Sequence, residues 1–478
     1  MFEHENDTIA AICTGTGGAV GIIRISGSHA LDAVRTVWRG KRMPGPEYPR
    51  VMLYGHIVSE NGAGEGEPSL AVFMPGPHSF TGEDVAEIHC HGGSFAARRA
   101  LRLVLQAGAR LAQNGEFTRR AFLNGKLDLT QAEGVLDLIN AGSERAGLLA
   151  ERQLNGAVGS LVREIRAEVV HLLSECESRL DFSEEDLDWM PPDVLCKKIR
   201  ALRGQAANLA LTARTGALIR DGVSLVIAGP PNAGKSSLLN RMLGYDRAIV
   251  TPVPGTTRDT LEESVSIGGI AFRVTDTAGL RDAEQADPVE AMGMERSQQS
   301  LGAADIVLWL LDASAPADSF PAQFEVMNKA KTAVRGKFIP CWNKMDGAAL
   351  SSAELDRAYA AGDSMKEKAD SGQPVFEHIS ARTGDGLDRL FRRLEETAWD
   401  GLPPAAQSGD AVVSERHAAL LEQAAKHLDA ACECVRAESW ELAGSSLRTA
   451  AELTGCITGE TATPDVLDEI FSRFCIGK

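Results

Sequence analysis

The chain has 478 residues with 49 basic and 66 acidic side chains, which gives a net charge of −17. Hydrophobic residues make up 44% and charged residues 24%, an ordinary globular composition that excludes a mostly disordered, collagen-like or fibrous chain. The length corresponds to two to four domains of roughly 100–200 residues each. So acidic a chain does not coat nucleic acid with its whole surface, although a local basic patch is compatible with this charge.

The first 122 residues mix short β-like runs with helices and predict an α+β domain. Strands are expected at 9–13, 20–26 and 85–91, a hairpin at 51–59 and 69–74, and helices at 30–38 and 95–111.

The spacing of apolar residues changes to that of helices between about 121 and 214, and again over 415–454. Between these stretches, apolar strand-like runs that each end in a loop occur at 224–228, 271–275, 306–311 and 337–341. Alternating strands and helices predict a parallel α/β sheet, so we expect an α/β domain inserted into a helical one. The expected domains are 1–122 (α+β), 123–218 (first helical part), 219–400 (α/β) and 401–478 (second helical part).

Cysteine usage and the termini bear on the compartment. The nine cysteines are scattered from Cys13 to Cys475 without a CxxC pair, which favours a reducing cytosol over a disulfide framework or a zinc site. The acidic N-terminus lacks the basic-then-apolar order of a signal peptide, and the longest apolar run, 306–311, is too short to span a bilayer. We therefore expect a soluble, cytoplasmic protein that does not enter a membrane.

A phosphate-binding loop follows the strand expected at 224–228. The segment Gly229-Pro-Pro-Asn-Ala-Gly-Lys-Ser236 fits the pattern G-x-x-x-x-G-K-[ST] in its strand–loop–helix context. The glycines let backbone N–H groups turn toward phosphate oxygens, Lys235 adds positive charge at the β- and γ-phosphates, and the Ser236 hydroxyl can ligate Mg²⁺.

Four further segments fit a nucleotide site in the right order. Asp276-Thr-Ala-Gly279 ends a strand, where its carboxylate can hold Mg²⁺ through water. Asn343-Lys-Met-Asp346 offers the Asp346 carboxylate to the N1–H and N2–H₂ donors of guanine, a pair that adenine lacks. Ser380-Ala-Arg382 suits a second loop on the base side, and Gly255-Thr-Thr-Arg-Asp259 lies where a switch threonine would close over Mg²⁺. Each segment alone is weak, but together with the phosphate loop they predict a GTP site.

The residue after Gly279 is Leu280, where Ras-like GTPases place a glutamine that positions water. Leucine cannot orient water, so hydrolysis needs another group or is slow. Glu290 is the candidate for this role, and the alternative for Glu290 is an ordinary solvated helix residue.

Segments from both ends and the middle of the chain resemble the tRNA modification GTPases of the MnmE (TrmE) family. Besides the five nucleotide motifs, the resemblance rests on Gly21-Ile-Ile-Arg-Ile-Ser-Gly27, Phe122-Leu-Asn-Gly-Lys-Leu-Asp-Leu129 and Phe474-Cys-Ile-Gly-Lys478. One departure is Thr14-Gly-Thr-Gly-Gly18, where the family usually has a Pro-Pro-Gly run, and it affects the expected shape of that loop.

The resemblance implies a multidomain fold: an N-terminal α+β folate-binding-like domain that dimerises, an all-α helical domain, and an inserted α/β P-loop (Ras-like) G domain. It implies a homodimer that binds formyl-tetrahydrofolate or a related one-carbon folate. It further implies that, as a heterotetramer with an FAD- and NADH-dependent partner called MnmG (GidA), the protein adds an aminomethyl or carboxymethylaminomethyl group to C5 of the wobble uridine of certain tRNAs. GTP hydrolysis, stimulated by K⁺ between paired G domains, would drive their opening and closing.

The resemblance also implies roles for individual residues. Glu290 would orient the attacking water, Ser236 and Thr257 would hold Mg²⁺, and the K⁺ ligands would be Asn232, Thr251, Val253 and Thr256. The expected folate-binding residues are Arg24, Glu87, Lys126 and Lys478. The other residues expected at GTP are Ala233, Gly234, Lys235, Ser237, Pro252, Pro254, Gly255, Asp276, Thr277, Ala278, Gly279, Asn343, Lys344, Met345, Asp346, Ser380, Ala381 and Arg382.

Several alternatives stay open. His89 and His91 share a strand face as metal ligands do, but no third ligand stands at a fixed spacing, which favours a structural role. Cys475 is either a small hydrophobic residue or takes part in the one-carbon chemistry. The alternative function is that of a GTPase switch in ribosome assembly or stress signalling. A folate enzyme with a vestigial G domain is disfavoured because every nucleotide motif is intact.

Overall fold

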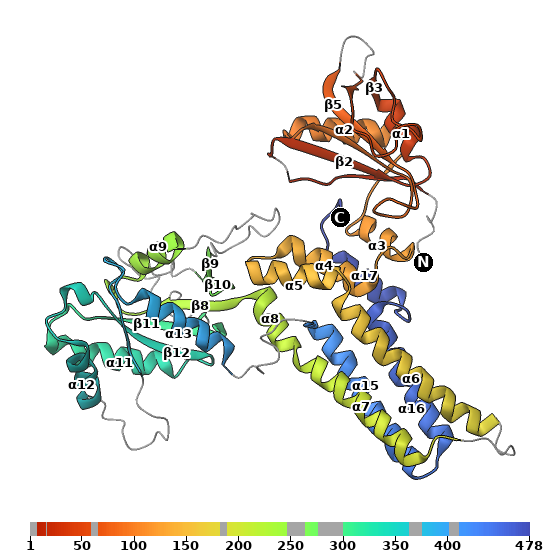
Figure 1. The fold of residues 1–478 in the computed structure, drawn as a ribbon. Helices are drawn as coiled ribbons and strands as arrows, with labels where there is room; N and C mark the ends of the chain where they lie inside the picture. The colour runs from red at the N-terminus through yellow and green to blue at the C-terminus, as the bar shows by residue number, and fades with distance from the viewer. Residues whose placement is uncertain are drawn as a thin grey trace. The chain divides into compact units, whose positions relative to one another are not determined.

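A computed structural model describes residues 7–15, 17–58, 66–181, 189–245, 263–275, 300–362, 375–400 and 411–478. Contacts divide the chain into two compact units (Figure 1). The first consists of Met1–Ile139, Ala150–Leu211 and Glu415–Lys478, and the second of Asn140–Leu149 and Thr212–Ser414. The boundaries expected from the sequence, near residues 122, 218 and 400, stay predictions.

A seven-stranded sheet forms the N-terminal part of the first unit, in the order β3-β4-β5-β6-β2-β1-β7. Neighbouring strands are antiparallel, apart from the parallel pair β1 and β7. The predicted strands 20–26 and 85–91 and the predicted hairpin are confirmed, whereas β3 and β7 were not predicted. The strands are β1 (Ile9–Ile12), β2 (Val20–Ser26), β3 (Trp38–Gly40), β4 (Leu53–Ile57), β5 (Glu67–Met74), β6 (Val85–His91) and β7 (Arg110–Leu111).

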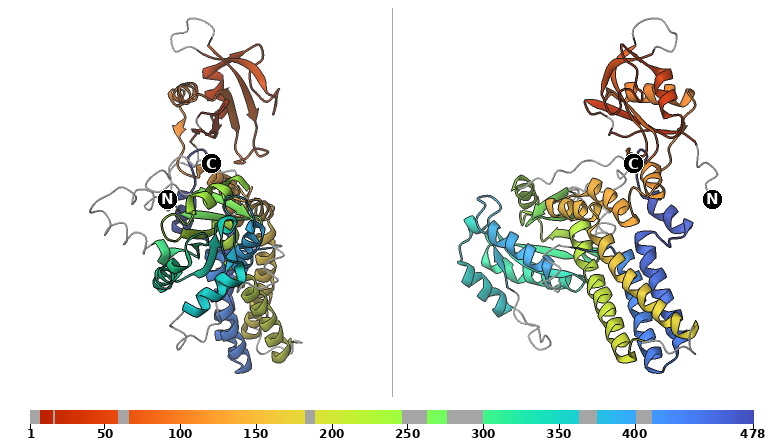
Figure 2. Two further views of the ribbon diagram at one scale, coloured as in Figure 1. Left: turned by 90° about the vertical axis from the view of Figure 1, so that its left-hand side faces the viewer. Right: turned by 45° about the vertical axis from the view of Figure 1, so that its right-hand side comes forward.

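Two helices, α1 (Ala30–Val37) and α2 (Ser94–Gln106), lie on one face of this sheet (Figure 2). Their buried alanine, valine and leucine residues share one apolar core with the inward-facing residues of the strands. The prediction of a helix over 95–111 was too long, because Gly108 takes a φ of +104° and the chain then continues as β7. This left-handed conformation ends the helix.

A buried charge cluster attaches the helix α3 (Glu116–Leu123) to the end of this sheet. The guanidinium of Arg120 lies 2.5 Å from Asp7 Oδ1, 3.2 Å from Glu83 Oε2 and 3.1 Å from Glu116 Oε1. Because Arg120 is only 8% exposed, its charge needs these three carboxylates in place of water.

Helices make up the rest of the first unit. The stretch predicted over 415–454 is two helices, with residues 437–439 between them. The long helices α6, α7, α15 and α16 pack side by side around one apolar core. The helices are α4 (Leu129–Asn140), α5 (Glu144–Leu154, whose first residues belong to the second unit), α6 (Ala157–Asp181), α7 (Pro192–Leu211), α15 (Glu415–Arg436), α16 (Trp440–Thr458) and α17 (Pro464–Ser472).

Glu133 ties α4 to the start of α15. Its Oε1 accepts a hydrogen bond from Arg416 Nε at 2.8 Å, and its Oε2 lies 2.6 Å from Nε2 of the fully buried His417. Burial raises the pKa of Glu133, but His417 and Arg416 outweigh it and lower the pKa to about 2. The carboxylate is therefore ionised, and removing both partners would leave a buried charge uncompensated.

The second unit contains a six-stranded sheet in the order β13-β12-β11-β8-β10-β9. All neighbouring strands are parallel except β9 and β10, so the predicted parallel sheet is confirmed and the antiparallel edge strand β9 was not predicted. The strands are β8 (Val223–Ala228), β9 (Glu263–Ile267), β10 (Ile270–Thr275), β11 (Ile306–Asp312), β12 (Lys337–Asn343) and β13 (Glu377–His378). The helices are α8 (Ala213–Asp221), α9 (Lys235–Tyr245), α11 (Phe320–Lys331), α12 (Ser352–Gly362) and α13 (Leu387–Trp399), with short 3₁₀ turns η3 (Ala317–Ser319) and η4 (Met345–Gly347).

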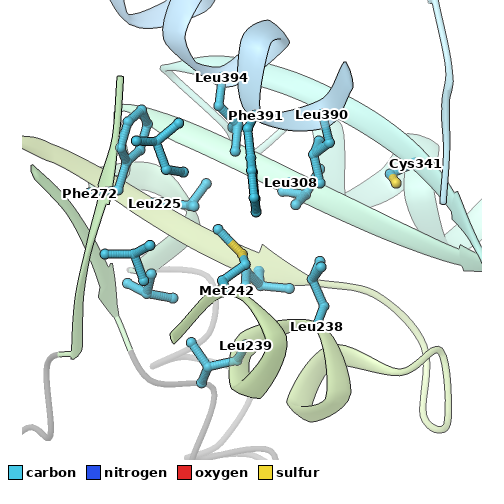
Figure 3. Packing of buried hydrophobic residues seen from close by; sticks show 14 of the residues in the cluster. Leu225, Leu238, Leu239, Met242, Phe272, Leu308, Cys341, Leu390, Phe391 and Leu394 are labelled. Carbon is cyan, nitrogen blue, oxygen red and sulfur yellow. The ribbon is translucent and has the colours of Figure 1, made fainter. Parts of the chain in front are cut away.

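Helices cover both faces of this sheet. Leu238 and Met242 of α9, with Phe391 of α13, point toward the strand residues Leu225 and Leu308 (Figure 3). On the other face, an aromatic cluster joins α11 and α12 to β11 and β12. This three-layer arrangement buries the parallel strands on both sides, as their continuous apolar runs require.

A cavity of about 360 Å³ lies at the amino-terminal ends of β8, β11 and β12, where Gly222, Ile306 and Lys337 line it. Leu218 of α8 and Thr397 of α13 line the same cavity. The helix that leads into the sheet and the helix that follows its last described strand therefore meet at one edge, opposite the loops described below.

Among the described residues, no helix combines the length and the apolar composition that crossing a bilayer requires.

Candidate functional sites

The phosphate-binding loop connects β8 to α9 at the carboxyl edge of the parallel sheet. Gly229 has a φ of +146°, and an added Cβ would lie 2.4 Å from the carbonyl oxygen of Leu310. Gly234 has a φ of +91°, and an added Cβ would lie 2.3 Å from Asn343 Nδ2. Both positions therefore need glycine. Asn232 between them also has a positive φ of 62°, a conformation that asparagine tolerates better than most residues.

Lys235 begins α9 and bends back over this loop. Its Nζ donates hydrogen bonds to the carbonyl oxygens of Gly229 at 3.0 Å and Pro230 at 2.8 Å. The ammonium group thus lies over the phosphate-binding loop, which leads into the N-terminus of α9. Ser236 and Ser237 are exposed in the first turn, where the Ser236 hydroxyl is open to a metal ion. The loop, the lysine and the helix N-terminus together form an anion-binding site.

The side chain of Asn343 connects its own loop to the phosphate-binding loop and to the loop at Ser380–Arg382. Its Nδ2 donates to the carbonyl oxygen of Ala233 at 2.8 Å, and its Oδ1 accepts from the backbone N–H of Ala381 at 3.0 Å. The side chain is buried, so both bonds form in a dry environment. The asparagine end of the base motif therefore fixes the phosphate loop and the second base loop in one arrangement.

Asp346 presents the carboxylate expected to recognise guanine. Its Oδ1 accepts a 2.6 Å hydrogen bond from the Ser380 hydroxyl, and its Oδ2 lies 2.8 Å from Nη2 of Arg382. The Ser380 hydrogen bond, with a further contribution from the charge of Arg382, holds the pKa of Asp346 below its usual range. A bound guanine would have to displace the exposed Arg382 from Oδ2, whereas Ser380 can keep its hydrogen bond.

Asp312 is a site residue that the sequence did not point to. It ends β11 directly opposite Asn343 on β12, and its Oδ2 lies 2.7 Å from Nζ of Lys344. Its Oδ1 accepts hydrogen bonds from the backbone N–H and the hydroxyl of Ser314, at 2.9 and 2.6 Å. Burial raises the pKa of Asp312, but Lys344 and Ser314 outweigh it, so the pKa falls. The sequence did offer one signal for Asp312, which is an acidic residue at the end of a buried apolar strand.

Replacing Asp312 by asparagine is expected to raise the KM for GTP roughly five-fold, as befits a partly exposed ion pair, and to leave kcat unchanged. The reason is that Lys344, which takes a left-handed φ of 62° beside Asp346, would lose the anchor that orients it. Asp400→Asn is the matched control, because Asp400 pairs with Lys337 at the other edge of the sheet. Steady-state hydrolysis rates measure both constants, and an unchanged KM in Asp312→Asn would contradict the assignment.

Part of the expected nucleotide site lies outside the described residues, so these positions stay predictions. They include the catalytic candidate Glu290 and two ligand segments. The segments are Thr251, Pro252, Val253, Pro254, Gly255, Thr256 and Thr257, and Asp276, Thr277, Ala278 and Gly279.

Arg24 and Glu87, expected at a folate, face each other across β2 and β6. Arg24 Nε lies 2.9 Å from Glu87 Oε1, and His89 Nε2 lies 3.1 Å from Glu87 Oε2. Burial raises the pKa of Glu87, but His89 and Arg24 outweigh it and hold the pKa below its usual range. The rings of Phe80 and Phe117 lie 5.3 and 5.8 Å from the Arg24 guanidinium carbon. A fixed ion pair between aromatic rings results.

The C-terminal segment lies against β1, next to this ion pair. The backbone N–H of Phe117 donates to Lys478 O at 3.2 Å, and a Cβ on Gly477 would lie 2.4 Å from the carbonyl oxygen of Ile12. Burial raises the pKa of the Cys13 thiol, while the positive charges of Arg24 and Lys478 oppose this shift. Cys13 was not predicted to lie near this site.

The two remaining candidates stand apart from that contact. Lys126 Nζ donates to the carbonyl oxygen of Pro77 at 3.0 Å, on the loop that carries Phe80. Cys475 is exposed, and its carbonyl oxygen accepts a hydrogen bond from the backbone N–H of Gly115 at 3.4 Å. One carboxylate that accepts hydrogen bonds and three basic side chains that donate them suit the chemistry of a folate, whose pterin donates hydrogen bonds and whose tail carries carboxylates.

The strand histidines both pair with glutamates. Besides His89 on Glu87, His91 Nδ1 lies 2.9 Å from Glu67 Oε1. In the ranges that the structure describes, no group of three or more His, Cys, Asp or Glu side chains is arranged to hold a metal ion.

Two family models match the chain. The one described as the MnmE helical domain matches residues 129–475, and the one described as the GTP-binding protein TrmE N-terminus matches residues 8–126.

Several proteins named tRNA modification GTPase MnmE are similar to this chain over nearly their whole length. The tRNA modification GTPase MnmE of Symbiobacterium thermophilum is 42% identical over 479 residues, and the protein of that name from Roseiflexus sp. is 42% identical over 477 residues. The one from Clostridioides difficile is 39% identical over 480 residues. Each match covers 99% of this chain and 99% of the relative. The solved G domain of the T. maritima FeoB iron transporter is 23% identical to this chain, with a TM-score of 0.26, and the match covers 37% of this chain and 98% of that chain.

Proposed function

Because this chain belongs to the MnmE family of tRNA modification GTPases, we propose that it acts with an FAD-dependent partner of the MnmG (GidA) type on the wobble uridine of certain tRNAs. The protein is a GTP-hydrolysing enzyme of tRNA modification. In this proposal a homodimer and its partner form a cytoplasmic heterotetramer that places an aminomethyl or carboxymethylaminomethyl group on C5. A bound formyl-tetrahydrofolate, or a related one-carbon folate, would supply the carbon joined to C5.

The observation that carries the proposal is the pairing of two sites in one chain. The carboxyl edge of the parallel sheet holds the phosphate loop and Asp346, and the N-terminal sheet holds the Arg24–Glu87 pair beside the C-terminal segment. A regulatory GTPase would need the first arrangement but not the second. Nucleoside analysis of tRNA from a deletion strain tests the proposal: the C5 group should disappear and return with the wild-type gene. Unaltered wobble uridine in the deletion strain would favour the regulatory switch instead.

In the proposed GTPase reaction, Lys235, Ser236, Thr257 and Glu290 would have distinct tasks. Lys235 would exchange the carbonyl oxygens of Gly229 and Pro230 for phosphate oxygens, because its ammonium already lies over the loop. The exposed Ser236 hydroxyl, with Thr257, would hold Mg²⁺, which would neutralise phosphate charge. Glu290 would orient the attacking water.

Potassium is proposed as a second cation at the phosphates, held by Asn232, Thr251, Val253 and Thr256. Of these ligands, Asn232 is described, and its exposed side chain lies on the phosphate loop, which supports this role. A cation there would take the charge-neutralising place of an arginine finger.

Hydrolysis is therefore expected to be faster in K⁺ than in Na⁺ at equal ionic strength, and Asn232→Ala should erase the difference. Asn240→Ala, an exposed asparagine on α9, is the control that should keep it. Phosphate release in matched chloride salts measures the effect. Equal wild-type rates in the two salts would speak against a bridging K⁺.

A one-carbon folate is expected to bind the dimer without GTP, and Glu87→Ala should weaken it about ten-fold or more, because hydrogen bonds to a charged acceptor are lost. Glu67→Ala is the matched control, since Glu67 of β5 also pairs with a histidine, His91 of β6, as Glu87 pairs with His89 within β6. Calorimetry of formyl-tetrahydrofolate binding measures both. A dissociation constant that Glu87→Ala leaves unchanged would remove Glu87 from the site.

A further inference from the structure

The exposed face of α2 carries three arginines and a phenylalanine, in a chain whose net charge is −17. The buried side of α2 is formed by Ala96, Ala97, Ala100, Leu103 and Val104. At 100° per residue, Phe95, Arg98 and Arg102 fall on the opposite, exposed side of the helix, and the half-buried Arg99 lies at its margin. We call these four residues the basic face.

The helix itself offers no balancing charge. The sequence of α2 contains no acidic residue, so the arginines at spacings of three and four repel one another. Phe95 is 76% exposed, more than any other large hydrophobic residue among those the structure describes. Exposed arginines beside an exposed aromatic ring are what an anionic ligand with aromatic bases would use.

Arg99 links α2 to a segment of the chain that is rich in basic residues. Arg99 Nη2 donates to the carbonyl oxygen of Val58 at 3.5 Å, and the N–H of Val58 donates to that of Val37 at 2.8 Å, at the junction of α1 and β3. Residues 28–50, which include this junction, hold five basic and two acidic side chains. Both acids already have partners: Asp32 lies 3.4 Å from His29 Nδ1, and Glu47 lies 3.3 Å from Arg35 Nη2.

We propose that the basic face binds the sugar–phosphate backbone of the substrate tRNA, with Phe95 stacking on an unpaired base. Arginine makes paired hydrogen bonds to phosphate, and aromatic side chains stack on the splayed bases of RNA loops. Arg98 and Arg102 are one turn apart, a rise of roughly 6 Å, which lets them reach successive phosphates. The inference rests on the proposed function, in which tRNA is the substrate.

The test measures binding of an unmodified tRNA to the full-length protein, with and without its FAD-dependent partner, by fluorescence anisotropy over a salt series. Arg98→Glu/Arg102→Glu is compared with Lys197→Glu/Lys198→Glu, which makes the same charge change at exposed positions of α7. The first variant should raise the dissociation constant at least ten-fold and lower the salt slope by roughly 1.4–1.8, the contribution of two phosphate contacts. The second should change neither by more than a small factor. Phe95→Ala should weaken binding of tRNA but not of a plain RNA duplex.

The outcomes separate the inference from the function on which it rests. Both double variants must hydrolyse GTP at the wild-type rate and show the wild-type far-UV circular dichroism and thermal unfolding curve, which establishes that both units are folded. An unchanged dissociation constant and salt slope in Arg98→Glu/Arg102→Glu would overturn the inference and leave tRNA modification standing. Loss of the FAD-dependent partner with unchanged tRNA binding would also overturn it, because the face would then dock a protein. A wild-type complex that binds no tRNA would instead refute the proposed function.

Discussion

Asp346→Asn is expected to weaken GTP binding at least about ten-fold and to create binding of xanthosine triphosphate, because hydrogen bonds to a charged acceptor are among the strong ones. The carboxylate can accept from both N1–H and N2–H₂ of guanine, whereas an asparagine amide accepts one hydrogen bond and donates the other. Xanthine carries a carbonyl oxygen where guanine carries its amino group, so it matches the amide. Ser380 should still bind the new side chain, because the amide oxygen can accept the hydroxyl that now bonds Oδ1 at 2.6 Å.

Equilibrium titration with labelled GTP, ATP and xanthosine triphosphate measures this change of base preference. Asp385→Asn is the matched control, because Asp385 is exposed in the second base loop and its carboxylate accepts from Thr383 rather than from a ligand. If wild-type protein binds GTP and ATP equally well, the assignment of Asp346 to the base is wrong.

Glu290→Ala is expected to slow the chemical step by two or more orders of magnitude and to leave the dissociation constant for GTP nearly unchanged. The loss of a positioned general base or water-orienting group costs about 10²–10⁴ in rate. Lys235 and Ser236 serve binding in the phosphate loop, whereas Glu290 lies outside that segment of the sequence. Under the proposed function, paired G domains open after each turnover, so the variant should remain closed and tRNA modification should fail in vivo.

Single-turnover hydrolysis with excess enzyme and nucleoside analysis of tRNA in a complemented deletion strain test the two halves of this prediction. Glu295→Ala is the control, because it removes a second glutamate of the same segment. Full hydrolysis by Glu290→Ala would refute the catalytic assignment. Slow hydrolysis with normal modification would refute the claim that turnover drives the chemistry, and would leave GTP as an assembly cofactor.

Local sequence patterns were sufficient for the central strands. The bounds predicted for β2 and β6 are those of the structure, because in both strands the buried residues alternate with less buried ones, the period of a β-strand. β7 is two residues long, and β9 has the polar sequence Glu-Ser-Val-Ser-Ile. Whether such segments form strands depends on pairing with a strand that is distant in the sequence, and local periodicity does not show that pairing.

The candidate sites divide in the same way. Glycines, with a lysine at the start of the following helix, predict a phosphate loop in a strand–loop–helix context. The backbone conformation of the loop requires the glycines, and the lysine supplies the positive charge. The brace from Asn343 to Ala233, the Asp312–Lys344 pair and the charge of Lys478 beside Cys13 join residues far apart in the sequence. Those contacts depend on the register of neighbouring strands and on the course of the last residues, which no motif encodes.

The cavity at the amino-terminal ends of the parallel strands has a mechanical consequence. The chain comes to this sheet through α8, and α13 ends beside α8, whereas the described nucleotide loops leave the sheet at its opposite edge. Ends that meet at one place let an entire α/β domain be inserted into a helical chain without parting the helices on either side. The same arrangement places the described phosphate loop and this junction at opposite ends of the parallel strands.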